Sequence, residues 1–398
     1  MSTKSKKNHQ RLLQTNCHIG IVGSGLGGLS AALAILQCGK YAGGEKQKVK
    51  ATHNKSEEEE TETNKRHSIC PVNSFQGRIT IYERDLHASD RKEGYGMTLT
   101  YNPNGPLAQL GILESIAKRD CPSRCHYLFN EKGEVKGYYG NAFHDIGDER
   151  NGTESKQSAL RGAGQRGNLR IPRAELRSIL LEKIRKEDES NNPPKVRIEW
   201  GKQLQSYIDR SVMKTNDPLQ WLGQTATNNV TFDNSNKTTS KRDVVLQFKD
   251  GSTDEVDLLI GADGVNSVVA KQYLSMSLSY KSHEPSSHVE VLPQYLGIFI
   301  VIGITTYMHP LIDERGYYTL DGEHRLFIMP FQGSQLDDQM RRTMWQLSYP
   351  IPNRDEALRL SRLSSEELQQ EILKRCNDWH APFPEMVKKT SVDTIWGT

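Results

Sequence analysis

The fold is decided by His18-Ile19-Gly20-Ile21-Val22-Gly23-Ser24-Gly25-Leu26-Gly27-Gly28, which runs on into Leu29-Ser30-Ala31-Ala32-Leu33-Ala34-Ile35-Leu36-Gln37-Cys38. Residues 18–22 form a short apolar run that predicts a buried strand. Residues 29–38 have the apolar pattern of a helix, and Gly39 is suited to close it. The turn between them has the spacing G-x-G-x-x-G. A strand, a glycine turn and a helix in this order predict the first βαβ unit of a dinucleotide-binding domain.

Each glycine of the turn has a separate mechanical role. Gly23 permits the tight turn, Gly25 lets the backbone approach a pyrophosphate, and Gly28 lets the helix pack closely on the strand. The free N–H groups at the helix start would then face the phosphates. We expect Ser24, Leu26 and Gly27 to complete the cofactor-binding loop. The alternative is a glycine turn that binds nothing.

The second strand, residues 78–82, is followed by Glu83. A carboxylate at this place can accept hydrogen bonds from the adenosine ribose and would repel a 2′-phosphate, which favours FAD or NAD over NADP. Glu83 lies 55 positions beyond Gly28, whereas about 20 are usual. The polar segment 40–76 supplies the excess, and a loop extended this far costs only roughly 2 kcal/mol. We predict that Glu83 and the adjacent Arg84 belong to the cofactor site, the alternative for Glu83 being an exposed carboxylate.

A third candidate segment is Gly261-Ala262-Asp263-Gly264. It follows the apolar run 256–260, which we interpret as a buried strand beside the nucleotide-binding strands. An acidic residue beyond the carboxyl end of such a strand would face a ligand crevice. The residues Lys249-Asp250-Gly251-Ser252 before it predict a hairpin between strands 244–248 and 256–260. An ordinary Asp-Gly turn is the alternative.

Composition excludes several classes of protein. The chain has 398 residues, with 52 basic and 49 acidic side chains and a net charge of +3, so we expect no nucleic-acid partner. The six cysteines are too sparse for a disulfide framework, and Cys121, Cys125 and His126 lack a second ligand pair for zinc. Residues 1–14 have no signal-like apolar core, and the longest apolar run, near 295–305, is too short for a membrane span. We expect a cytoplasmic protein without a membrane span.

The remaining pattern is a helix over 106–117, a hairpin over 124–139, a helix over 172–186, and then mainly strands up to residue 349. A helical tail follows, in which Ser364 and Glu367 form a capping box. The segments 40–76 and 145–167 are polar, and we expect the first to be a disordered insertion.

Three pieces together resemble the para-hydroxybenzoate hydroxylase-like group of FAD-dependent aromatic hydroxylases. They are the glycine loop with Glu83, the run Arg170-Ile171-Pro172-Arg173-Ala174-Glu175-Leu176, and Gly261-Ala262-Asp263-Gly264-Val265-Asn266-Ser267. The resemblance implies that Arg173 contacts FAD, and that Asp263 with Gly264 touches both the pyrophosphate–ribose part of FAD and the nicotinamide cofactor. A guanidinium is suited to phosphate, although a surface arginine at a helix start is the alternative for Arg173.

The resemblance implies an α/β fold in which a Rossmann-like FAD-binding βαβ domain is interleaved with a β-rich substrate domain. We expect a disordered N-terminus over 1–16, a discontinuous FAD-binding domain over 17–291, a substrate-domain sheet over 292–350 and a helical segment over 351–398. The group has an arginine shortly after Asp263-Gly264, where this sequence has Val268-Val269-Ala270-Lys271. It also has a third flavin segment, a Gly-Asp before a helix, which nothing from residue 350 on matches. We therefore expect the chain to stop before that segment.

By the same resemblance, NADH or NADPH reduces FAD, and the enzyme uses O₂ to hydroxylate a small organic, aromatic substrate. The cofactor carries this chemistry, so no catalytic side chain is predicted. Candidate substrate-wall residues are Tyr295, Phe299, Phe327, Met329 and Trp345. At alternating strand spacing such residues belong more often to the core, so no substrate contact is predicted among them. Two alternatives remain: another flavin oxidoreductase on this scaffold, such as a halogenase or prenyl-lipid reductase, and a degenerate nucleotide-binding protein without activity.

Overall fold

The computed structural model describes residues 17–38, 75–90, 94–121, 123, 125–140, 168–189, 191, 193–210, 242–282, 293–332 and 341–398. The predicted N-terminal segment 1–16, the polar segment 145–167 and nearly all of the insertion 40–76 lie outside these ranges. The chain divides into two compact units. Unit 1 is Met1–Asp90 with Leu180–Val291, and unit 2 is Arg91–Ile179 with Leu292–Thr398.

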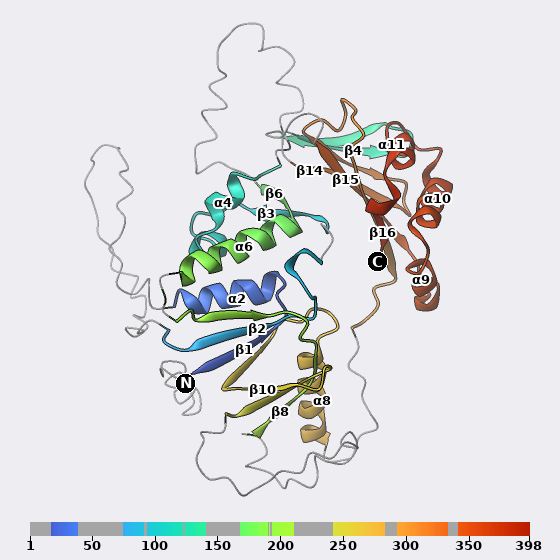
Figure 1. Cartoon of the computed structure of the whole chain (residues 1–398). Helices are drawn as coiled ribbons and strands as arrows, with labels where there is room; N and C mark the ends of the chain where they lie inside the picture. The colour runs from blue at the N-terminus through green and yellow to red at the C-terminus, as the bar shows by residue number, and fades with distance from the viewer. Residues whose placement is uncertain are drawn as a thin grey trace, which may run out of the picture. The chain divides into compact units, whose positions relative to one another are not determined.

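Unit 1 is built on a parallel sheet with the strand order β11-β1-β2-β7 (Figure 1). Its strands are β11 (Leu258–Gly261), β1 (His18–Val22), β2 (Arg78–Tyr82) and β7 (Val196–Glu199). Ile21 of the fully buried β1 lies between Ile81 and Ile260 in the register. Helix α2 (Leu26–Leu36) runs along one face of this sheet and buries Leu29, Leu33 and Leu36. The predicted βαβ start is confirmed.

An antiparallel sheet of order β10-β9-β8 completes the described strands of unit 1. Its strands are β8 (Leu204–Asp209), β9 (Val244–Phe248) and β10 (Thr253–Val256), and α8 (Val268–Ser282) packs against β8. The prediction of one strand over 256–260 was wrong. Val256 ends β10, which pairs with β9, whereas Leu258 begins β11 in the parallel sheet. The chain changes sheets at Asp257, whose carboxylate accepts hydrogen bonds from the His18 backbone and from Arg242.

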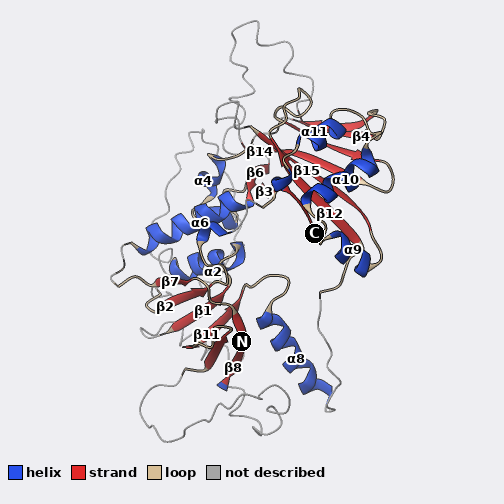
Figure 2. Cartoon of the chain, turned by 45° about the vertical axis from the view of Figure 1, so that its right-hand side comes forward, coloured by secondary structure: helices blue, strands red, loops and turns tan. Residues whose placement is uncertain are grey.

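Unit 2 contains a seven-stranded mixed sheet of order β16-β12-β15-β14-β13-β4-β5. The strands are β4 (Cys125–Asn130), β5 (Val135–Gly140), β12 (Ile298–Thr305), β13 (Arg315–Leu320), β14 (Arg325–Gln332), β15 (Arg342–Pro350) and β16 (Ile395–Gly397). The helices α9 (Arg354–Leu360), α10 (Ser365–Cys376) and α11 (Phe383–Lys389) contribute to a core on one face of this sheet (Figure 2). Trp345, Phe299 and Tyr317 lie in that core. The short helix η5 (Val392–Thr394) precedes β16.

The predicted helix over residues 106–117 is two short helices, α3 (Pro106–Gln109) and α4 (Leu113–Ala117). Gly111 between them has a φ of 66°, which interrupts the helix. A two-stranded ribbon of β3 (Gly96–Thr100) and β6 (Asn168–Pro172) leads into α6 (Arg173–Asp188), which starts one residue later than predicted because Pro172 still pairs with Gly96. The short helix η1 (Ala88–Asp90) ends the first segment of unit 1.

Among the residues that the structure describes, no helix is both long and apolar enough to cross a membrane.

Candidate functional site

The glycine turn between β1 and α2 is closed by contacts that exclude side chains. Gly23 has a φ of 101°, and a Cβ on it would lie 2.4 Å from the carbonyl oxygen of Ala262. A Cβ on Gly28 would lie 1.9 Å from the carbonyl oxygen of Gly23. A side chain at Gly23 would therefore displace the segment at Ala262, and one at Gly28 would displace the turn from the start of α2. The predicted roles of Gly23 and Gly28 in a tight turn and close packing therefore have a direct geometric basis.

The N-terminus of α2 has no side-chain cap. The N-cap residue Gly25 has an extended backbone and offers no side-chain hydrogen bond, and the first turn holds no acidic residue. A Cβ on Gly27 would meet no atom within 4 Å, so space lies beside the turn. The first N–H groups of a helix have no partner within it and carry a partial positive charge. The residues present therefore fit an anionic group such as a pyrophosphate.

Glu83 lies directly beside this turn. Its side chain is only 1% exposed. Its Oε2 accepts hydrogen bonds from both the backbone N and the Oγ of Ser24, each at 2.7 Å, and its Oε1 accepts one from the Asp85 backbone at 3.2 Å. The alternative of an exposed strand-end carboxylate is wrong, because the insertion before β2 leaves the end of this strand at the turn. The contact of Ser24 with Glu83 was not foreseen from sequence.

The third predicted segment meets the first two in unit 1. The Ala262 backbone donates to the carbonyl of Val22 at 2.8 Å, and the Gly23 backbone donates to the carbonyl of Tyr82 at the same distance. Three pieces that are far apart in the sequence therefore converge at one end of the parallel sheet. Such a crevice beyond the carboxyl ends of parallel strands is where ligands bind in open α/β sheets.

The side chain of Asp263 has a structural role that the sequence did not reveal. Its Oδ1 accepts a hydrogen bond from Ser267 Oγ at 2.5 Å, and its Oδ2 accepts one from the Val268 backbone at 2.6 Å. The carboxylate thus caps the start of α8. Gly264 has a φ of 82°, and a Cβ on it would meet open space. In this segment the backbone of Gly264, rather than the carboxylate of Asp263, lies next to open space.

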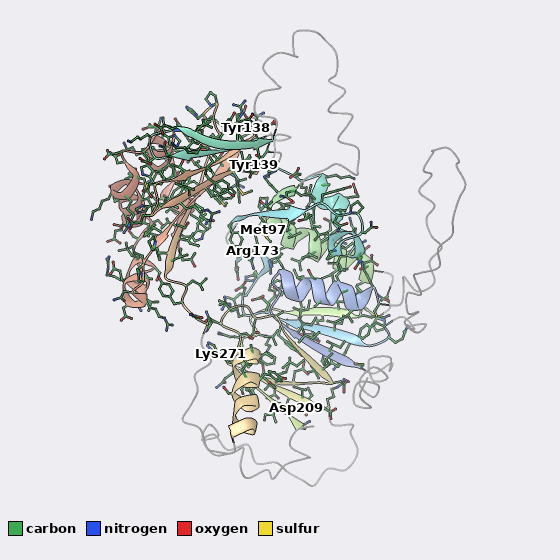
Figure 3. The ribbon with its side chains drawn as sticks, turned by 180° about the vertical axis from the view of Figure 1, so that it is seen from behind. Met97, Tyr138, Tyr139, Arg173, Asp209 and Lys271 are labelled. Carbon is green, nitrogen blue, oxygen red and sulfur yellow. The ribbon has the colours of Figure 1, made fainter. Side chains whose placement is uncertain are left out.

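The predicted basic residues lie at three separate places. Arg84 has a side chain that is 67% exposed, with Asp85 3.9 Å away. Arg173 is the first residue of α6 in unit 2, where its backbone N donates to the Tyr95 carbonyl at 3.0 Å. Lys271 lies in the first turn of α8 (Figure 3). A cation in a first turn is opposed by the helix dipole, so an anion near Arg173 would relieve an unfavourable placement.

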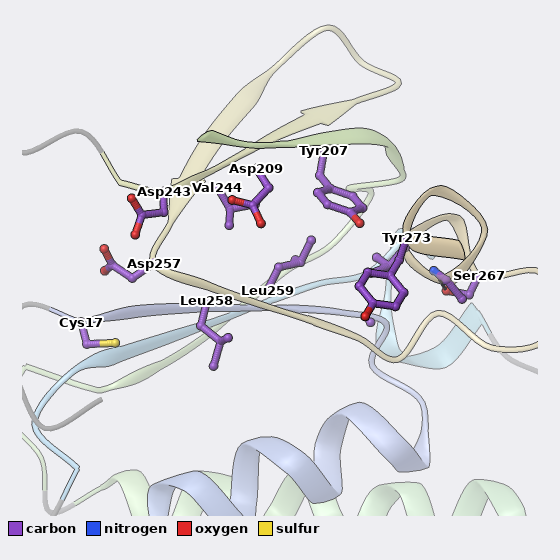
Figure 4. Close-up of a pocket in the computed structure, with 13 residues that line it drawn as sticks. Cys17, Tyr207, Asp209, Asp243, Val244, Asp257, Leu258, Leu259, Ser267 and Tyr273 are labelled. Carbon is purple, nitrogen blue, oxygen red and sulfur yellow. Dashed lines mark hydrogen bonds between the residues drawn. The ribbon is translucent and has the colours of Figure 1, made fainter. Parts of the chain in front are cut away.

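A pocket of about 500 Å³ in unit 1 is lined by Gly261 and Ser267 of the third candidate segment, but by no residue of the glycine turn (Figure 4). The carboxylates of Asp243 and Asp257 lie at one end and the rings of Tyr207 and Tyr273 at the other. The residues that line it include three aspartates, with Asp209 the third, and no lysine or arginine, so the lining offers no positive charge to a pyrophosphate. We therefore place the candidate dinucleotide site at the glycine turn rather than in this pocket.

The sulfur and imidazole groups of the described residues form no metal-binding cluster. The Cys121 thiol donates to the carbonyl of Phe331 at 2.9 Å, and burial raises the pKa of this thiol to about 12. His126 Nε2 is shared between Ser123 and Arg170. These residues lie in unit 2, and the pattern of Cys121, Cys125 and His126 gave no sign of this arrangement.

No family model and no curated protein matches the sequence. Solved structures nevertheless resemble it in fold: the chain has the α/β fold of FAD-dependent monooxygenases of the para-hydroxybenzoate hydroxylase type. One is HpxO of Klebsiella pneumoniae, complexed with FAD and uric acid, at 15% identity and a TM-score of 0.56, covering 97% of this chain and 69% of that one.

A second similar structure is 2,6-dihydroxypyridine-3-hydroxylase of Arthrobacter nicotinovorans, at 17% identity and a TM-score of 0.56, covering 97% of this chain and 72% of that one. A third similar structure is that of a protein from Photorhabdus luminescens subsp. laumondii, described as an FAD-containing monooxygenase. It has 17% identity and a TM-score of 0.55, covering 96% of this chain and 75% of that one. The predicted fold is confirmed by these likenesses.

Proposed function

We propose that this chain is an FAD-dependent monooxygenase that uses NADH or NADPH and O₂ to hydroxylate a small organic, aromatic substrate. The observation that carries the proposal is the convergence of the glycine turn, Glu83 and the Asp263-Gly264 segment in unit 1. The proteins of similar fold support it, since their names describe FAD-containing enzymes and one complex holds FAD with uric acid.

The proposed FAD site uses main-chain groups for the phosphates. The open N-terminus of α2 would bind the pyrophosphate, with Gly23, Ser24, Gly25, Leu26, Gly27 and Gly28 as the surrounding loop. Glu83, already held by Ser24, would accept the ribose hydroxyls. Arg84, Arg173 and the backbone of Asp263 and Gly264 complete the proposed set. Unit 1 would be the FAD-binding domain, and the sheet of unit 2 would hold the substrate.

When bound, FAD supplies the electron transfer and the reaction with O₂. The residues of this chain bind and orient the groups around it. Ser24 donates two hydrogen bonds to one oxygen of Glu83, which fixes the carboxylate beside the glycine turn. The buried β1 and α2 hold the turn rigid, so the N–H groups need no rearrangement when a phosphate arrives.

The purified full chain tests the proposal directly. We expect it to retain FAD after gel filtration, seen as flavin absorbance, and to consume O₂ with NADH or NADPH when an aromatic substrate is present. Flavin retention without O₂ consumption across a panel of aromatic compounds would favour another flavin oxidoreductase. A folded chain that stays colourless in excess FAD would contradict the proposal.

Gly25→Val locates the site. The backbone of Gly25 is extended, a conformation that valine adopts readily, and the valine side chain would stand where the pyrophosphate binds. We expect a folded protein that has lost its FAD. Gly137→Val in unit 2 is the matched control, because a Cβ there meets no atom within 4 Å, and it should keep the flavin. Equal flavin content in both variants would contradict the glycine-turn assignment.

A further inference from the structure

Helix α8 lies beside the edge strand β8 (Figure 1) and is tied to it by one side chain. The carboxamide of Gln272 bonds to both main-chain groups of Tyr207. Its Oε1 accepts from the Tyr207 backbone N at 3.1 Å, and its Nε2 donates to the Tyr207 carbonyl. Among the described strands, only β9 pairs with β8. Gln272 therefore occupies the hydrogen-bonding groups that a further strand would use.

Tyr207 is a firm attachment point because it belongs to the core that carries the ends of β1 and β2. This core contains Val22 and Tyr82, the residues directly before Gly23 and Glu83. Tyr207 itself is only 8% exposed. A fixed contact with Tyr207 thus relates α8 to the two strands that end in the glycine turn and in Glu83.

Helix α8 is in turn tightly joined to the third candidate segment. A Cβ on Gly261 would lie 2.8 Å from the Cβ of Val269, so the helix and the segment are in close contact. Ser267 Oγ accepts a hydrogen bond from the Ala270 backbone at 2.9 Å and donates one to the Asp263 carboxylate. The carboxylate and the first turn of the helix are therefore linked, and a shift of α8 would move the segment with it.

The third candidate segment touches the glycine turn at the other side. A Cβ on Gly23 would lie 2.4 Å from the carbonyl oxygen of Ala262 and 3.2 Å from the Cα of Asp263. Two backbones packed this closely cannot shift independently. The place of the Asp263 and Gly264 backbone beside the turn is therefore set by α8 as well as by β11.

We propose that Gln272 is a positioning residue, which ties α8 to β8 and thereby fixes the backbone of Asp263 and Gly264 against the glycine turn. Two hydrogen bonds to one residue restrain the rotation of the amide as well as its distance. Backbone groups that are already fixed lose little freedom when a ligand binds, so the tie should raise the affinity for FAD. The effect on FAD rests on the proposed function, whereas the fixing of the backbone does not.

Gln272→Met in the full chain tests the tie, because methionine is unbranched and of similar length but cannot make the two amide hydrogen bonds. Without FAD, we expect faster hydrogen exchange than in the wild type at residues 261–268, with residues 18–22 of β1 unchanged. Titration of FAD, followed by flavin fluorescence, should show an affinity about tenfold lower, as the loss of these hydrogen bonds implies.

Gln272→Glu distinguishes the hydrogen bonds from the bulk of the side chain. An ionised carboxylate can accept from the Tyr207 backbone N but has no proton for the Tyr207 carbonyl, whereas a protonated carboxyl has both groups of the carboxamide. Its ordinary pKa of about 4.3 is raised by a bond that only the neutral form makes. Relative to the wild type at the same pH, we expect both readouts to be impaired at pH 8 and to recover towards pH 5. Gln272→Met should stay impaired at both.

Gln369→Met is the matched control, because Gln369 of α10 also donates to backbone carbonyls, those of Val387 and Thr390 in unit 2. It should leave both readouts unchanged. Unchanged exchange or undiminished FAD affinity in folded Gln272→Met, an equal response in the control, or no recovery of Gln272→Glu would each overturn the inference. If Gln272→Met does not fold, Gln272→Glu alone decides. A wild type that binds no FAD overturns the proposed function, and hydrogen exchange then still decides whether Gln272 fixes the segment.

Discussion

Gly27 and Gly28 are neighbours in the sequence but have different surroundings. A Cβ on Gly28 would lie 1.9 Å from a backbone oxygen, whereas one on Gly27 would meet nothing within 4 Å. We expect Gly28→Ala to lower the free energy of unfolding by roughly 1–3 kcal/mol or more. Gly27→Ala should be neutral or stabilising by up to about 1 kcal/mol, because alanine favours the helix. Urea unfolding measures both, and equal midpoints would contradict the packing of the turn.

His126 makes the stability of the protein depend on pH. Burial, then Arg170, lowers the pKa of this residue from 6.5 to about 4. Between these values the unfolded chain binds the proton and the folded chain does not, so the unfolding free energy falls as the pH drops from 6.5 towards 4. We expect His126→Gln, which keeps an acceptor for Arg170, to lose less stability than the wild type between pH 7 and pH 5. Parallel losses in urea unfolding would show that His126 does not contribute.

For single residues, the sequence predicted where a residue lies in the fold better than it predicted which partners its side chain contacts. The place of Glu83 beside the glycine turn followed from strand order and survived a long insertion. The carboxylate of Asp263 turned towards α8, because Ser267 and the helix start offer it donors at once. Arg170 and His126 were not singled out as a pair, since they are 44 positions apart and only the fold brings them together.

Helix α10 is the element whose start was read most directly from sequence. Ser364 accepts a hydrogen bond from the Glu367 backbone at 3.2 Å, and Glu367 accepts one from the Ser364 backbone at 2.7 Å, which confirms the predicted capping box. We expect Ser364→Ala to destabilise unit 2 by about 1 kcal/mol. Ser178→Ala is the control, because its exposed hydroxyl bonds only to a carbonyl within α6. Similar unfolding midpoints for the two variants would argue against the cap.

The predicted boundaries of elements were wrong where the chain passes directly from one sheet into another. Val256 packs over Gly20, with 3.0 Å between its side chain and a Cβ built there, and this holds the end of β10 against β1. Leu258, two residues later, pairs with Ile19 as part of β11. An apolar run gives no signal for such a change of sheet. The prediction of one helix over 106–117 was wrong for a simpler reason. Gly111 has a positive φ, which no α-helix contains.

For the whole molecule, the parallel sheet could be predicted and the seven-stranded sheet could not. The βαβ rule fixes β1 beside β2, and the carboxyl-end turns then gather on one edge. In unit 2, β4 pairs in parallel with β13, although about 190 residues separate them in sequence, and no turn encodes that pairing. The candidate wall residues divide accordingly: Phe299 and Trp345 lie in the helix-covered core, whereas Phe327 and Met329 pack on the other face.

The division into two units predicts which backbone segments FAD binding would protect from hydrogen exchange. A ligand that binds only the folded state stabilises it, by about 2.7 kcal/mol at a hundredfold excess over its Kd. We expect added FAD to slow hydrogen exchange at residues 18–36, 78–85 and 258–268, because the backbone groups at the glycine turn, Glu83 and Asp263 lie there. Strands β12 and β15 of unit 2 pair with each other across eight positions and serve as the internal reference, with exchange unchanged. Protection that is uniform over both units, or confined to the pocket residues Tyr207 and Tyr273, would move the cofactor away from the turn between β1 and α2.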